Sequence, residues 1–288
     1  MKILTLLIVL LACNRYGQAQ VIKSDSLKIG DQFRSFHFQK PVSDSKGYSL
    51  VFVLHGSGNS GKQFINNIND FNVIAEQEKL IAVFPDAFKK YWNECRKSSP
   101  AEANQLNLNE NLFFSEMIEY FTSKYSIDPK KVFIIGTSGG GHMAYKMALT
   151  MPEKFRAIAA LIANLPSPDN LDCSESKIPV NMMMVNGTED TINPYQGGKV
   201  ILGTRDFGSV RSTDETFGYW AGLAGYSGAP KKELLPNTDP GDGKTIERIS
   251  FYGAKKSVVL YKVIGGKHDY PGDISVHLEA WKFFKSTF

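Results

Sequence analysis

The stretch that most constrains the fold runs from Lys131 to Leu149, where features of a strand, a tight turn and a helix follow one another. Val132 to Ile135 is a short apolar run rich in β-branched residues, which predicts a buried strand. The residues from His142 to Leu149 contain no proline and favour a helix. Between the two elements, Gly136-Thr-Ser-Gly-Gly140 surrounds Ser138 with glycines. Since glycine lets strand and helix approach closely, we expect Ser138 to project from the turn on a strained backbone.

The rest of the chain alternates apolar strands with helical stretches. We expect strands at residues 33–39, 49–54, 81–84, 156–162, 180–185, 246–252 and 257–264, and helices at 110–125, 209–224 and 274–284. Residues 20–30 are interpreted as a polar linker, and 96–109 and 227–244 as loops. This alternation predicts an α/β fold with a mostly parallel central sheet and helices on both faces. No internal repeat or separating linker interrupts residues 20–288, which we interpret as a single catalytic domain.

The first residues have the form of a secretory signal. Met1 to Ala12 carries one lysine and then an apolar run too short to span a bilayer. Cleavage after Ala19 would give a protein of the periplasm or the extracellular space. The alternative is a lipoprotein signal ending before Cys13, because Leu10-Leu-Ala-Cys13 resembles a bacterial lipobox that would attach a lipid anchor for the outer membrane. No other apolar run is long enough to be transmembrane.

Charge and cysteine content narrow the function classes. The net charge is +4, and Lys2 and Arg15 of the leader contribute two of these charges, so nothing in the composition indicates a nucleic-acid partner. Without the leader, Cys95 and Cys173 are the remaining cysteines. In an oxidising compartment they either form a disulfide or stay as two buried thiols, and the sequence leaves both alternatives open.

A serine nucleophile requires a base and an acid that orients the base. The segment around Ser138 resembles the G-x-S-x-G elbow of α/β-hydrolases, in which the acid and then the histidine follow the serine along the chain. That order excludes His37, His55 and His142 and leaves His268 and His277. His268 follows an apolar strand directly, in a glycine-rich loop, whereas His277 lies within the last helix. Catalytic groups lie at the carboxyl ends of such strands, so His268 is the predicted base.

The acid and the oxyanion donors are expected at the ends of other strands. Asp190 follows the strand at 180–185 and is the predicted acid, with Glu189 as the alternative. Acyl transfer also needs two N–H donors for the developing oxyanion. We expect one at Gly139, directly after the nucleophile, and one at Ser57, in the loop after the strand at 49–54.

The same early loop suggests a rival function. Gly56 to Lys62 fits the G-x-x-x-x-G-K pattern of a phosphate-binding loop, but the next residue is Gln63 where serine or threonine would hold Mg²⁺. The chain also lacks an H-E-x-x-H motif, and its histidines are scattered. We therefore predict no cofactor and no metal.

Five short motifs in this order look like the polyhydroxybutyrate depolymerase and feruloyl esterase group of α/β-hydrolases. They are His55-Gly-Ser-Gly58, Trp92-Asn93, Gly136-Thr-Ser-Gly-Gly140, Gly187-Thr-Glu-Asp190 and Gly265-Gly-Lys-His268 with Pro271-Gly272, within a likeness that covers roughly residues 30–285. The resemblance implies a catalytic triad of Ser138, Asp190 and His268, with the Ser57 and Gly139 amides as oxyanion donors. It implies an exported serine esterase that acts through an acyl-enzyme.

Two departures from that group concern the substrate. Tyr270 stands where many relatives have tryptophan, and His142 stands where a smaller or apolar residue is common. Trp92 and Tyr270 are the candidates for stacking on an acyl or sugar group. Since no added polymer-binding domain is present, we expect a soluble ester or oligomer as substrate. The alternatives are a peptidase or acyltransferase on the same fold, or a non-catalytic binding protein.

Overall fold

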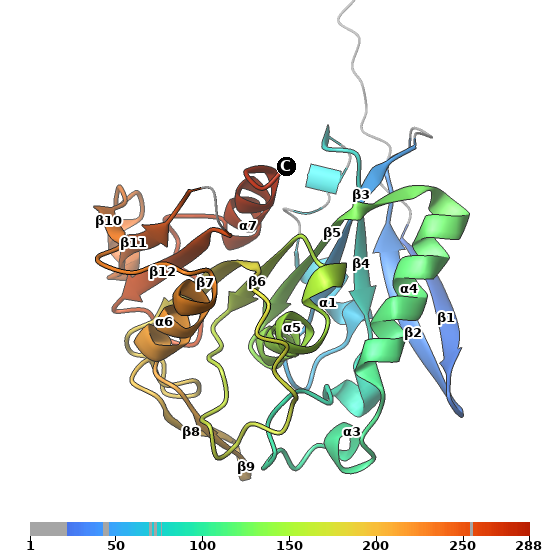
Figure 1. The fold of residues 1–288 in the computed structure, drawn as a ribbon, viewed down its shortest axis with the longest axis horizontal. Coiled ribbons are helices and arrows are strands. Elements are labelled where there is room, and N and C mark those ends of the chain that lie inside the picture. The colour runs from blue at the N-terminus through green and yellow to red at the C-terminus, as the bar shows by residue number, and fades with distance from the viewer. Residues whose placement is uncertain (1–21, 43–45, 69–70, 72–73, 76, 254–255) are drawn as a thin grey trace, which may run out of the picture.

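The structure is a computed structural model that describes residues 22–42, 46–68, 71, 74–75, 77–253 and 256–288. The predicted leader and Cys13 lie outside these residues. Among the described residues, a ten-stranded sheet has the order β1-β2-β4-β3-β5-β6-β7-β12-β11-β10 (Figure 1). The six strands from β4 to β12 in this order are parallel, and antiparallel strands extend both edges. The prediction of a mostly parallel central sheet is confirmed.

The elements have the following bounds. The strands of the main sheet are β1 (Lys23–Ile29), β2 (Gln32–Gln39), β3 (Tyr48–Leu54), β4 (Leu80–Pro85), β5 (Ile127–Thr137), β6 (Ala157–Leu161), β7 (Asn181–Gly187), β10 (Lys231–Leu234), β11 (Thr245–Phe251) and β12 (Val258–Ile264). A separate hairpin pairs β8 (Gly198–Leu202) with β9 (Arg205–Val210). The helices are α1 (Gly61–Asn67), α3 (Glu102–Gln105), α4 (Glu110–Tyr125), α5 (Gly139–Thr150), α6 (Thr213–Leu223) and α7 (Val276–Lys285), with 3₁₀ turns at η1 (Phe88–Lys90), η2 (Pro152–Lys154) and η3 (Pro240–Asp242).

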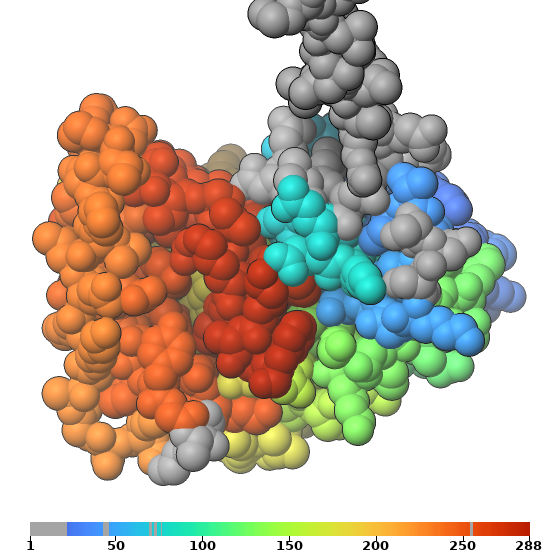
Figure 2. All heavy atoms as spheres, turned by 90° about the horizontal axis from the view of Figure 1, so that it is seen from above, coloured from blue at the N-terminus to red at the C-terminus, as the bar shows by residue number. Residues whose placement is uncertain are grey.

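Helices cover both faces of the sheet because its strands are apolar on both sides. Along β3, Leu50, Phe52 and Leu54 belong to one buried cluster, whereas the alternate residues Val51 and Val53 belong to the other. Helices α4, α5 and α6 pack on the first face, and α1 and α7 on the second. Figure 2 shows the second face, with the red C-terminal helix between the orange last strands and the blue and green N-terminal half.

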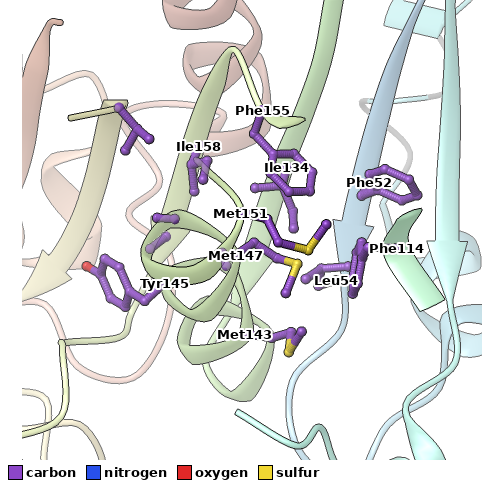
Figure 3. Packing of buried hydrophobic residues seen from close by; sticks show 14 of the residues in the cluster. Phe52, Leu54, Phe114, Ile134, Met143, Tyr145, Met147, Met151, Phe155 and Ile158 are labelled. Carbon is purple, nitrogen blue, oxygen red and sulfur yellow. The ribbon is translucent and has the colours of Figure 1, made fainter. Parts of the chain in front are cut away.

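Helix α5 is held against the first face by a row of methionines. Met143, Met147 and Met151 point from α5 and its C-terminal end toward Leu54 and Phe114 (Figure 3). Unbranched methionine side chains fill irregular gaps between helix and sheet. This packing fixes the amino end of α5, where Ser138 precedes the helix.

Serine and asparagine caps start most of the longer helices. Asn109 accepts a hydrogen bond from the amide of Leu112 at the start of α4, and Ser275 does the same for Leu278 at α7. At α6, Ser212 and Glu215 form a reciprocal capping box. The cap at Asn109 explains why the helix predicted over residues 110–125 begins at Glu110.

Four predictions of local structure were wrong. The expected linker at 20–30 contains β1, which pairs with β2 along its whole length. The expected loop at 227–244 contains β10, and the expected loop at 96–109 contains the short helix α3. The helix expected from residue 209 begins at Thr213, because residues 205–210 form the second strand of the β8–β9 hairpin. No helix in the described part of the chain is long and apolar enough to cross a membrane.

Candidate active site

Ser138 lies on a strained turn between β5 and α5. Its φ of 54° and ψ of −115° are unusual for a residue with a side chain. A Cβ added at Gly136 would lie 1.9 Å from the carbonyl oxygen of Gly140. The turn therefore closes only because Gly136 has no side chain, and this closure directs the serine hydroxyl out of the sheet.

The hydroxyl of Ser138 is hydrogen-bonded to the histidine that the sequence analysis selected. His268 Nε2 lies 2.9 Å from Ser138 Oγ, and His268 Nδ1 lies 2.7 Å from Asp190 Oδ2. The three residues come from the loops after β5, β7 and β12, which are parallel strands with their carboxyl ends at one edge of the sheet. The structure thus places Ser138, His268 and Asp190 in one chain of hydrogen bonds.

Asp190 is shielded from water and held from both sides. Its side chain is 1% exposed, and its second oxygen, Oδ1, accepts hydrogen bonds from the amides of Ile192 and Asn193, each 2.8 Å long. Glu189, the alternative acid, is exposed. His277, the alternative base, is buried on α7 against the rings of Phe71 and Tyr270. Neither alternative belongs to the chain of hydrogen bonds.

The two residues predicted as oxyanion donors are close neighbours. A Cβ added at Gly139 would lie 2.9 Å from the backbone nitrogen of Ser57 and 2.4 Å from its hydroxyl oxygen. Gly139 is also the first residue of α5, where backbone N–H groups lack partners within the helix. The loop after β3 and the amino end of α5 thus converge beside Ser138.

His55 supports the loop that carries Ser57. Its Nδ1 is bonded to the carbonyl of Gly56, and its Nε2 accepts from the amide of Ala87. Burial lowers the pKa of His55 to about 4, so its ring is neutral at neutral pH. The ring is a structural support for the turn at residues 55–58.

Trp92 was predicted to stack on substrate, and the structure contradicts this prediction. The indole is 2% exposed, donates to the carbonyl of His55 over 3.0 Å and packs beside the His55 ring. Trp92 therefore stabilises the loop at residues 55–58 from behind. A buried tryptophan needs a partner for its N–H, and the His55 carbonyl provides it.

Tyr270 also lies away from the cavity at Ser138. Its hydroxyl is 2.5 Å from Thr137 Oγ1, and its ring packs edge-on against His277. Burial raises the pKa of Tyr270 to about 12. Through this contact with Thr137, the residue before Ser138, Tyr270 supports the turn.

A cavity of about 20 Å³ opens beside Ser138, little more than one water molecule requires. Its walls combine polar and apolar side chains from distant parts of the chain: Ser57, Arg96, Ser138, Gly139, His142, Ile192, Asn193, Val200, Leu202 and Phe207. His142, singled out in the sequence, thus does line the cavity. Burial and the nearby Arg96 guanidinium hold the pKa of His142 well below its usual value, which keeps the ring neutral.

Sequence reasoning did not find Arg96. This residue is 2% exposed and forms a buried ion pair with Glu94, with Nη2 2.8 Å from Oε1. Its guanidinium lies 4.6 Å from the centre of the Phe207 ring. The feature of the sequence that could have indicated Arg96 is its position next to Cys95, because a disulfide at Cys95 would fix the backbone there.

The structure contains that disulfide, between Cys95 and Cys173. Beside it, the amide of Lys97 donates to the carbonyl of Asn170, and the Asn170 side chain donates to the carbonyl of Phe207 in β9. Three segments distant in sequence are therefore joined beside the cavity, and two of them contribute Arg96 and Phe207 to its wall.

Comparisons with known proteins agree with this architecture. Residues 41–202, which include Ser138 and Asp190, match the family described as Phospholipase/Carboxylesterase. A putative esterase, NocK, from Nocardia uniformis subsp. tsuyamanensis is 26% identical over 79% of this chain and 67% of its own. Probable feruloyl esterase C from Aspergillus niger is 23% identical over 83% of this chain and 78% of its own.

A solved structure gives the same result for the fold. Acetyl xylan esterase from Aspergillus awamori has a TM-score of 0.63, with 19% identity, and the match covers 91% of this chain and 99% of that one. The predicted α/β-hydrolase fold is confirmed, and so is the resemblance to the feruloyl esterase and depolymerase group.

Proposed function

Because the chain belongs to the phospholipase and carboxylesterase family of α/β-hydrolases and is a carboxylic ester hydrolase, we propose that Ser138, His268 and Asp190 are its catalytic triad. The observation that carries the proposal is the continuous hydrogen bonding from Ser138 Oγ through His268 to Asp190. Each role follows from the position of the residue in that chain.

The first half of the reaction forms an acyl-enzyme. His268 Nε2 accepts the proton of Ser138 as Oγ attacks the ester carbonyl, and the backbone N–H groups of Ser57 and Gly139 stabilise the negative charge on the carbonyl oxygen. Asp190 keeps the other nitrogen of His268 protonated and stabilises the imidazolium that forms. His268 then gives its proton to the leaving alcohol.

The second half releases the acid. Water enters on the His268 side, loses a proton to Nε2 and attacks the acyl carbon, after which Ser138 regains its proton. The oxyanion donors act a second time at this step. We expect a soluble ester or oligomer rather than a solid polymer as the substrate.

An intact-mass experiment tests the triad. The mature protein and its Ser138→Ala variant are incubated with a fluorophosphonate, and turnover of p-nitrophenyl acetate and methyl ferulate is measured in parallel. We expect one label on the wild type, none on the variant, and loss of ester turnover in a variant that keeps its circular dichroism spectrum. A folded wild type without label or turnover would refute the proposal. Release of amines from amides, or acyl transfer to an added alcohol at a higher rate than hydrolysis, would favour a peptidase or an acyltransferase.

Export is a second part of the proposal. It is supported by the apolar leader in the sequence and by the Cys95–Cys173 disulfide, because such bonds persist in oxidising compartments. Mass spectrometry of the protein from its host should find an N-terminus at Gln20. An acylated Cys13 would instead establish the lipoprotein form, and an intact Met1 in the cytosolic fraction would contradict export.

A further inference from the structure

His142 is a buried histidine beside the triad that none of the reaction steps above uses. It lies on α5, one turn after Ser138, and its backbone amide donates to the Ser138 carbonyl over 3.0 Å. The residue is 2% exposed. In the group that the chain resembles, a smaller or apolar residue is common here. Burying an imidazole costs free energy unless its polar atoms have partners, so the partner of the ring indicates its role.

The ring of His142 is bonded to the side chain of Asn193, in the loop after β7. His142 Nε2 lies 3.0 Å from Asn193 Nδ2, which also donates to the carbonyl of Ile162 over 3.0 Å. A carbonyl oxygen only accepts, so the atom of Asn193 that faces Ile162 is the NH₂ nitrogen. The same nitrogen then donates its other hydrogen to Nε2 of His142. This arrangement requires a neutral ring with its proton on Nδ1.

Asn193 connects His142 to the proposed acid of the triad. The backbone N–H of Asn193 donates to Asp190 Oδ1 over 2.8 Å, while Oδ2 of the same carboxylate is bonded to His268. Because both hydrogens of the Asn193 side-chain amide have acceptors, the residue is restrained where its backbone N–H meets Asp190. The hydrogen bonds form a closed ring that leads from the Ser138 hydroxyl through His268, Asp190, Asn193 and His142 back to the Ser138 carbonyl.

The backbone that supplies the second acceptor for Asn193 is strained. Ile162 directly follows β6 and has a φ of 47°, a conformation that β-branched residues rarely adopt. Its amide donates to the carbonyl of Val185 in β7, and its own carbonyl accepts from Asn193. Strain of this kind persists where the surrounding contacts impose it, and it is concentrated at functional sites. This second observation, independent of His142, indicates that the placement of Asn193 has a function.

We propose that His142 is a positioning residue for Asp190: by accepting from Asn193, it ties the loop that carries the acid to the first turn of the helix that follows Ser138. The inference rests on the proposed function, because it concerns the acid of the same triad. The tie links Asp190 to Ser138 by a route that does not pass through His268, the residue that gains and loses a proton in each step. His142 transfers no proton and acts through Asn193.

Glutamine and methionine at position 142 provide the test, because the two side chains have the same length and similar volumes. The glutamine oxygen can accept from Asn193 in place of Nε2, whereas a methionine sulfur is a weak acceptor. With p-nitrophenyl acetate, His142→Met should lower kcat by about tenfold and leave KM within about twofold, and His142→Gln should recover most of kcat. Equal kcat in the two variants would overturn the inference. A change confined to KM would also overturn it, because His142 would then be a substrate-binding residue.

Further variants show whether the effect passes through Asn193 and Asp190. Asn193→Ala removes the side chain but keeps the backbone N–H, so it should lower kcat to a similar extent, and it tests the same contact if His142→Met does not fold. Combining the two changes should add little. In an Asp190→Ala background, His142→Met should have no further effect on kcat, because no carboxylate is left to position. Losses that multiply in either combination would refute the inference.

The matched control is Asn181→Ala. Asn181 is also a buried asparagine, and it lies at the opposite end of β7, where its side chain bonds to the backbone of Arg156 and Ser257. Its replacement should lower the free energy of unfolding but keep wild-type kcat. If Asn181→Ala lowers kcat as much as Asn193→Ala does, the loss reflects a general loosening of the fold and the positioning role is rejected.

An NMR measurement separates this inference from the triad proposal. The Nδ1 proton that His268 donates to Asp190 gives a downfield signal, which reports on that hydrogen bond without turnover. The signal should be sharp in the wild type and in His142→Gln, and broadened or shifted upfield in His142→Met. If the wild type is neither labelled by the fluorophosphonate nor active but the signal follows this order, the triad proposal fails and the positioning of Asp190 by His142 stands. Normal wild-type turnover, with the same kcat and the same signal in both variants, rejects the positioning role alone.

Discussion

Asp190 and His268 are joined by a 2.7 Å hydrogen bond in which the carboxylate is almost completely shielded from water. Two backbone amides hold the other oxygen of Asp190, so the carboxylate cannot rotate away from the histidine. This arrangement fixes which nitrogen of His268 faces Ser138, and it gives the first prediction.

Replacing Asp190 by asparagine should lower kcat by about 10³- to 10⁴-fold with the fold unchanged, because an amide would favour the wrong tautomer of His268. The measurement is initial-rate kinetics with p-nitrophenyl acetate. Glu189→Gln is the matched control, because Glu189 is exposed and next in sequence, and it should keep wild-type kcat. Equal losses in both variants would contradict the assignment of the acid.

Gly136→Ala should destabilise the protein by at least about 3 kcal/mol, because the new Cβ would overlap the Gly140 carbonyl oxygen and the turn would have to open. Urea unfolding measures the effect. Gly218→Ala is the control: Gly218 lies within α6 with nothing within 4 Å of an added Cβ. Alanine there should stabilise the helix by about 0.5–1 kcal/mol. If Gly136→Ala leaves the free energy of unfolding unchanged, the turn is less tightly packed than its geometry indicates.

Stability should fall as the solution is acidified from about pH 6.5 to about pH 4. His55 has a pKa near 6.5 when unfolded and about 4 when folded because it is buried. In this window the unfolded chain binds the extra proton, so acid favours unfolding, and above pH 6.5 the contribution is constant. For this shift the loss is roughly 3 kcal/mol. Urea unfolding at several pH values should show that the free energy of unfolding depends less on pH in His55→Gln than in the wild type. If the two proteins show the same pH dependence, His55 is not its source.

Removing the disulfide by the double change Cys95→Ala and Cys173→Ala should cost about 4 kcal/mol in the chain-entropy account, because the bond closes a loop with a sequence separation of 78 residues. Thermal and urea unfolding measure the loss. Unchanged stability would show that the noncovalent contacts hold these segments without the bond.

The sequence predicted the central strands because they depend on local patterns, and motif order selected Ser138, Asp190 and His268, which the fold brings into one chain of hydrogen bonds. Apolar runs in β3, β5 and β7 bury residues on both faces, and Ser138 is marked by the glycines around it. β1 was missed because its sequence, KSDSLKI, is polar and mostly solvent-facing at a sheet edge. Its structure comes from pairing with β2, a contact that composition does not encode.

The missed parts of the site have the same cause. Arg96 pairs with its near neighbour Glu94, but the segment around Asn170 and Phe207 in β9 reach it only through the fold, and no local pattern links these positions. Trp92 was interpreted as a substrate platform because an aromatic residue in a loop offers no signal of its burial. Only the folded chain shows that its N–H is committed to the His55 carbonyl.

The β8–β9 hairpin lies outside the main sheet, yet it contributes Val200, Leu202 and Phe207 to the cavity wall. Ser138, His268 and Asp190 all come from loops of the parallel strands instead. Part of the cavity wall thus lies on a piece of the chain that is separate from the strands preceding Ser138, Asp190 and His268. We expect that exchange of residues 198–210 can change the ester specificity while the turn that carries Ser138 stays as it is.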